Sequence, residues 1–88
     1  MSTEPILPFW FKQRQAKAES AGNDTYRLTA PNLREAFVSV RQDSEGRWGA
    51  SLRLAADGPE VAVTTTAYPT QGDAWDAAFE LYRRELVV

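Results

Sequence analysis

Hydrophobic and polar residues alternate between residues 36 and 67, with two breaks rich in turn-forming residues. Alternation with a period of two is typical of a strand that buries one face. The breaks read DSEG (Asp43–Gly46) and DGP (Asp57–Pro59), where glycine can adopt positive φ and aspartate can bond its own backbone. The pattern predicts three antiparallel strands, at about 36–42, 47–56 and 60–67.

The period changes after the strands. Large apolar side chains recur three or four residues apart, at Trp75, Phe79, Tyr82 and Leu86. This spacing predicts a helix over about 70–86 with one buried face, and Thr70 is suited to cap its first turn. The predicted fold class is therefore α+β: a three-stranded antiparallel β-meander packed on one C-terminal amphipathic helix.

The first 25 residues follow neither period. Phe9, Trp10 and Phe11 are consecutive, so their rings cannot share one helical face, and the prolines at 5 and 8 prevent a regular helix there. Two interpretations remain: a short helix from Phe9 through FKQRQAKAE, or an arm that docks through its rings, which the consecutive rings favour. We expect residues 1–25 to form an aromatic arm or short helix with a polar linker, and residues 26–88 to form the βββα domain.

The alternation assigns the strand residues to two faces. The face toward the helix takes Val38, Val40, Trp48, Ala50, Leu52, Leu54, Val61 and Val63. The opposite face takes Phe37, Ser39, Arg41, Arg47, Gly49, Ser51, Arg53, Ala62, Thr64 and Thr66. The second set contains three arginines, four hydroxyls and no acid, so it is the candidate binding surface, together with Trp10 of the arm. An ordinary solvated sheet face would have a similar composition, and the aromatic arm could fold over it.

The charge balance does not indicate a dedicated nucleic-acid binder. The chain has 10 basic and 12 acidic residues, a net charge of −2, and residues 26–69 carry five arginines against five acids. Nucleic-acid binders usually show a local excess of positive charge. Asp43 and Glu45, in the first turn, would also oppose the approach of a phosphate.

Catalysis and metal binding have little support in the residue types. The chain has no cysteine and no histidine, which excludes thiol nucleophiles and the usual near-neutral base. Asp73, Asp76 and Glu80 could hold a hard cation, but a solvated acidic helix face is far commoner. The threonines at 64–66 have no visible base to activate them. We therefore predict no enzymatic activity, no cofactor and no metal.

The stretch VRQDSEGRWGASLR, followed by EVAVTTTAYPTQGDAWDAAFELY, resembles the DNA-binding domain of plant ethylene-response factors and the related amino-terminal domains of phage integrases. The resemblance implies a three-stranded sheet backed by one helix, whose sheet face enters the major groove. Arg41 and Arg53 match arginines that touch DNA, and Trp48 matches an aromatic of the core. Asp43 and Glu45 depart from the pattern, because the plant family has an arginine and a tryptophan there.

If the N-terminal helix forms, the order helix, three strands, helix also looks like the double-stranded-RNA-binding domain. That family grips phosphate with lysines at the start of its last helix. The corresponding stretch here reads QGDAWD, which reverses the charge, so the resemblance extends to topology and not to function.

These observations predict a small non-enzymatic binding module. Its partner is expected to be an unidentified protein, bound through the arginine- and hydroxyl-rich sheet face and the aromatic arm. Nucleic-acid binding by the same face is the alternative. No apolar run approaches the ~20 residues of a membrane span, so a soluble, cytoplasmic protein without membrane association is expected.

Overall fold

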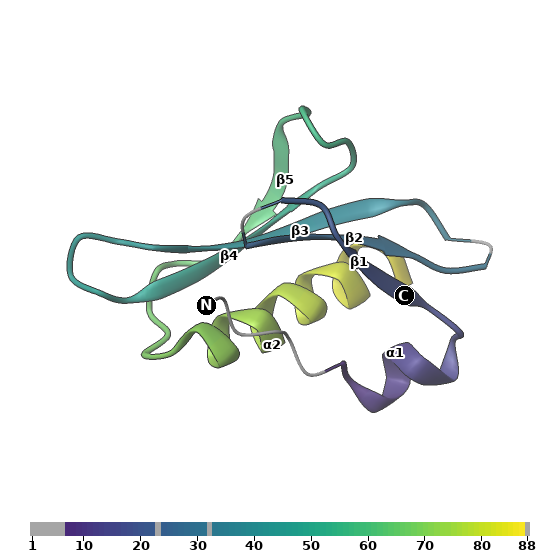
Figure 1. Ribbon diagram of the computed structural model, residues 1–88, viewed down its shortest axis with the longest axis horizontal. Helices are drawn as coiled ribbons and strands as arrows, with labels where there is room; N and C mark the ends of the chain where they lie inside the picture. The colour runs from purple at the N-terminus through teal and green to yellow at the C-terminus, as the bar shows by residue number, and fades with distance from the viewer. Residues whose placement is uncertain (1–6, 23, 32, 88) are drawn as a thin grey trace.

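The computed structural model describes residues 7–22, 24–31 and 33–87. The elements follow the order α1 (Phe9–Gln13), β1 (Lys17–Ser20), β2 (Thr25–Thr29), β3 (Ala36–Gln42), β4 (Trp48–Arg53), β5 (Glu60–Val63) and α2 (Gln71–Tyr82), which ends in a π-helical turn, Arg83–Val87. Both α-helices lie on one side of the sheet, and β5 rises on the other side (Figure 1). The predicted α+β class, with an antiparallel sheet and a C-terminal helix, is confirmed.

The sheet has five strands in the order β1-β2-β3-β4-β5, each antiparallel to its neighbours. The predicted count of three is therefore wrong, because β1 and β2 extend the meander from the N-terminal side. The turn between them contains Gly22 at φ 136° and Asp24 at φ 54°, conformations that glycine and aspartate tolerate better than most residues. A boundary at residue 25 would separate β1 from the strand with which it pairs.

The core lies between α2 and the inner face of the sheet. Trp75, Phe79 and Tyr82 of α2 are buried against Val38 and Leu52 of the central strands. Thr70 caps the helix, since its Oγ1 accepts a hydrogen bond from the Asp73 N–H at 3.1 Å. The helix predicted from the apolar period is confirmed, as is its packing on the sheet.

The aromatic run of the N-terminus joins this same core. Phe11 is buried with its ring edge-to-face against Phe79, 5.1 Å between centroids, and Trp10 stacks on Tyr82 at 6.4 Å. The helix ends at Gln13, and Gln15 at φ 58° turns the chain into β1. The suggested helix through residue 19 is therefore wrong. The rings of Trp10 and Phe11 pack on the α2 side and not over the candidate face, Phe9 is exposed, and residues 1–6 of the predicted arm lie outside the described residues.

Strand β5 faces the opposite way to that predicted. Ala62 pairs with Leu52 and is partly buried, whereas Val63 pairs with Ser51. Val61 and Val63 expose 47% and 50% of their surface. The cause is a register irregularity between Leu52 and Arg53, since a shift of one residue exchanges the two faces of a strand.

Candidate binding surface

The outer face is the sheet surface opposite α2. The strand register places on it the residues Arg27, Phe37, Ser39, Arg41, Gly49, Ser51, Arg53 and Val63. Most of the predicted binding residues lie here. The prediction that this face has no acid is wrong, because Glu60 lies 3.9 Å from Arg41 and Glu19 lies 3.2 Å from Arg27.

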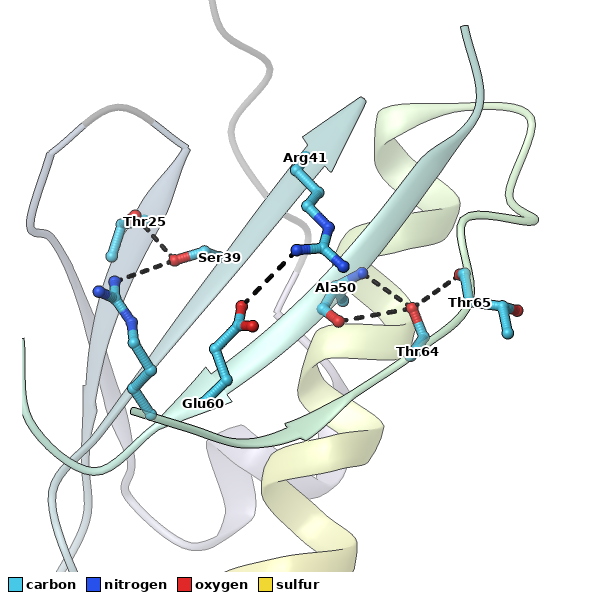
Figure 2. A network of polar contacts seen from close by, with 8 residues as sticks. Thr25, Ser39, Arg41, Ala50, Glu60, Thr64 and Thr65 are labelled. Atoms are coloured by element: carbon cyan, nitrogen blue, oxygen red, sulfur yellow. Dashed lines mark hydrogen bonds and ion pairs between the residues drawn. The ribbon is translucent and has the colours of Figure 1, made fainter. Parts of the chain in front are cut away.

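Arg41 is the most accessible of the predicted arginines within the strands. Its side chain is 56% exposed, and its Nη1 is 3.9 Å from a carboxylate oxygen of Glu60, a pair visible at the centre of Figure 2. Opposite Arg41 on β4 is Gly49, where an added Cβ would come within 2.9 Å of the Thr66 methyl group. Thr66 therefore packs closely over Gly49, and its methyl group fills the space that a side chain at position 49 would occupy.

Arg53 is tied into the fold by two hydrogen bonds. Its Nη1 donates to the Ala56 carbonyl at 2.7 Å, and its Nη2 donates to Ser39 Oγ at 3.3 Å. Ser39 Oγ also lies 2.9 Å from Thr25 Oγ1, so three strands share one polar network (Figure 2). Ser51, the neighbour of Ser39 on β4, is 5% exposed. This part of the predicted site is organised internally and offers little free hydrogen-bonding capacity.

Arg47 lies outside the strands, in the β3–β4 turn. Its Nη2 is 2.7 Å from Glu45. Its backbone N–H and that of Glu45 donate to the Asp43 carboxylate at 3.0 and 2.9 Å. These bonds, the one from Arg47 foremost, hold the pKa of Asp43 below its ordinary value of 3.8. The predicted placement of all three arginines on one strand face is therefore wrong for Arg47, which belongs to the turn.

Phe37 was expected to be exposed, but only 8% of its surface is accessible. It lies on the outer face, paired with Arg27 on one side and Arg53 on the other. Arginine stems are long enough to shield an aromatic ring while their charged ends stay in water. Phe37 therefore stabilises the sheet and is not a free contact for a partner.

Thr64 has a structural role at the edge of β4. Its Oγ1 accepts from the Ala50 N–H at 2.9 Å and donates to the Thr65 carbonyl at 3.0 Å (Figure 2). The backbone N–H of Thr64 donates to the Ala50 carbonyl at 2.9 Å. Just after β5 ends, the Thr64 hydroxyl accepts the Ala50 N–H in place of the backbone carbonyl that a continuing strand would offer. Trp10 lies on the other side of the sheet against Tyr82, so the structure does not bring it to the outer face.

Two exposed residues that sequence reasoning missed complete the surface: Val61 and Val63. The sequence indicates the DGP turn before β5. It carries no sign of the bulge between Leu52 and Arg53, which determines which side chains of β5 face the helix. The outer face thus has three parts. Val61 and Val63 are half exposed, Arg41 and Glu60 form an accessible ion pair, and the hydroxyl of Ser39 is hydrogen-bonded to Thr25 and Arg53.

No family model, curated protein or solved structure shows significant similarity to this chain. Within residues 7–22, 24–31 and 33–87, no helix is long and apolar enough to cross a membrane. In the same ranges, no group of three or more acidic side chains is arranged to hold a metal ion.

Proposed function

We propose that this protein is a small non-enzymatic module that binds another protein through the outer face. One observation carries the proposal: Val61 and Val63 expose about half of their surface on the strand that also supplies Glu60, the partner of Arg41. Protein interfaces favour this combination, an apolar centre bordered by arginine and other polar groups.

The ion pairs support a protein partner over a nucleic acid. Arg27, Arg41 and Arg47 each have a glutamate within 4.0 Å. Exposed pairs of this kind contribute only about 0–1 kcal/mol each to stability, but they offset the positive charge on which phosphate binding depends. The net charge of −2 adds to this opposition.

The hydroxyl groups support a non-catalytic role. The Thr64 hydroxyl contacts backbone atoms of Ala50 and Thr65, and the Ser39 hydroxyl contacts Thr25 and Arg53. A nucleophilic hydroxyl needs an adjacent base to take its proton. These partners fix local structure instead.

The experiment is quantitative affinity capture from a cell extract with paired variants. Arg41→Glu places a repelling charge beside Glu60, and Val61→Glu removes exposed apolar surface. The controls are Arg14→Glu, which makes the same charge change on an exposed residue of the α1 end, and Phe9→Glu, which replaces a side chain that is 75% exposed. Proteins lost with the first pair and retained with the controls support the outer face. Equal capture by all four variants argues against it.

DNA binding by the outer face is the second candidate, favoured by the accessibility of Arg41 and by the resemblance noted in the sequence. Fluorescence anisotropy with mixed-sequence duplexes and single strands at low and moderate salt tests it. We expect no binding even at low salt. Binding that weakens steeply with salt, and that Arg41→Glu abolishes, would replace the protein-binding proposal.

A further inference from the structure

A groove lies on the other flank of β5, between its end and α2. It has a volume of about 550 Å³, and its lining includes Val63, Thr64 and Tyr68 on one side and residues of α2 on the other. Ala77 and Leu81 supply apolar surface, and Asp73, Asp76 and Glu80 supply three carboxylates. We call this the acidic groove. It shares Val63 with the outer face, but Arg41 and Val61 do not line it.

The carboxylates of the acidic groove are largely unneutralised. Asp73 and Asp76 form no ion pair within the part of the chain that the structure describes. Glu80 has Arg83 at 3.4 Å, with both side chains more than half exposed. Arg84 is the one basic residue among the described residues that line the groove, and its Nε is 3.7 Å from Glu85 Oε2. On the outer face, in contrast, Arg27 and Arg41 are each paired with a glutamate. The groove therefore favours a positively charged occupant.

The strand beside the groove is an edge strand of the sheet that the described residues form. Among the residues that the structure describes, β5 is last in the sheet order and pairs with β4 alone. Thr64 donates its N–H to Ala50, and antiparallel pairing directs the backbone groups of alternate residues to opposite sides. The N–H and C=O of Val63 therefore point away from β4, where an added strand would find them.

We propose that the acidic groove binds an extended basic segment of a partner protein, which adds to β5 as a sixth strand. Alternate side chains of such a segment point to opposite sides. On the α2 side, lysines or arginines would contact Asp76 and Glu80, and on the opposite side the apolar residues would lie beside Val63. A second copy of this chain fits less well, because its own α2 would bring like charges to the contact.

The test measures binding of a fluorescent peptide of about nine residues that alternates lysine and valine to the full 88-residue chain. The double variant Asp76→Asn/Glu80→Gln removes two groove charges. The matched control Glu35→Gln/Asp57→Asn removes two exposed charges elsewhere. We expect the groove variant to bind at least about fivefold more weakly and the control to stay within about twofold of wild type.

Two further peptides separate strand addition from simple charge attraction. The same peptide with alternate backbone nitrogens methylated keeps its charge but cannot pair as a strand, and it should bind at least about tenfold more weakly. A glutamate–valine peptide should not bind. Equal weakening by both double variants, equal binding of the methylated peptide, or no binding of the lysine peptide would overturn the proposal. None of these peptide measurements changes Arg41 or Val61, the two residues that are varied to test the outer face, so failure of one proposal can be told from failure of the other.

Discussion

Leu52 lies opposite Ala62 in the β4–β5 pair, and this pairing decides which side of β5 reaches solvent. Because Leu52 is in the core, Ala62 faces inward with it, and the valines on either side of Ala62 face outward. The exposed apolar surface of the outer face therefore depends on one register position.

That register predicts which of two substitutions lowers the free energy of unfolding more. Ala62→Asp places a carboxylate against the core and should lower the free energy of unfolding by about 2 kcal/mol. Val63→Asp places it in solvent and should cost less than about 1 kcal/mol. Urea unfolding of both variants checks the order. A larger loss for Val63→Asp would mean that β5 has the opposite face inward.

The N-terminal aromatic residues should differ sharply in their contribution to stability. Phe11→Ala removes a fully buried ring from Phe79 and Tyr82 and should lower the free energy of unfolding by about 3–5 kcal/mol. Phe9→Ala, in the same helix but exposed, should change it by less than about 0.5 kcal/mol. Thermal and urea unfolding make the comparison. Similar small effects at both positions would show that α1 is not part of the domain core.

Tyr82 carries a buried hydroxyl with no hydrogen-bond partner among the described residues. Tyr82→Phe keeps the ring contacts and removes this hydroxyl, so it should raise the free energy of unfolding by about 0.5–1 kcal/mol. Burial also raises the pKa of Tyr82 above its ordinary value of 10.0. The unfolded chain therefore ionises first, wild type loses stability as the pH rises above 10.0, and Tyr82→Phe lacks this loss. A destabilised phenylalanine variant would indicate that the hydroxyl has a partner.

The lowered pKa of Asp43 predicts an acid dependence for the β3–β4 turn. The contribution of its carboxylate to stability is present above the unfolded pKa, near 3.8, and is lost as the pH falls through the lower folded value. Asp43→Ala should therefore lower the melting temperature at pH 7, and its difference from wild type should shrink below pH 3.8. Asp43→Asn, which can still accept the Glu45 and Arg47 N–H bonds, serves as the control. An unchanged difference across the acid range would contradict this account.

The sequence predicts the elements whose signal is apolar side-chain periodicity. The stripe containing Trp75 and Phe79 indicates α2, and alternation around the Asp43–Gly46 turn indicates β3 and β4. Strand β1 reads KAES and is held by backbone pairing with β2, with three of its four side chains exposed. Such a strand has no apolar pattern to reveal it. The sequence prediction therefore lacks β1, the N-terminal edge strand of the sheet.

The sequence predicts which face of the sheet carries the candidate site, but not which of its side chains are exposed or already bonded. Arg41 and Ser39 are on the expected face, because β3 alternates regularly. Which groups are free there depends on contacts between distant segments, such as Arg41 with Glu60 and Arg53 with Ala56. Phe37 also follows the alternation, yet only 8% of its surface is accessible, and it is paired with an arginine on each neighbouring strand. Alternation gives the direction of a side chain and not what covers it.

Photo-crosslinking from the outer face tests the proposed function most directly. In one variant Val61 is replaced by p-benzoylphenylalanine, and in a second variant the exposed Phe9 is replaced by the same residue. Both variants are irradiated in an extract of the source cells. We predict a discrete adduct with one protein from position 61 alone, which untagged wild type competes away and Arg41→Glu does not. No adduct at position 61, the same adduct from both positions, or an adduct with nucleic acid would contradict protein binding by the outer face.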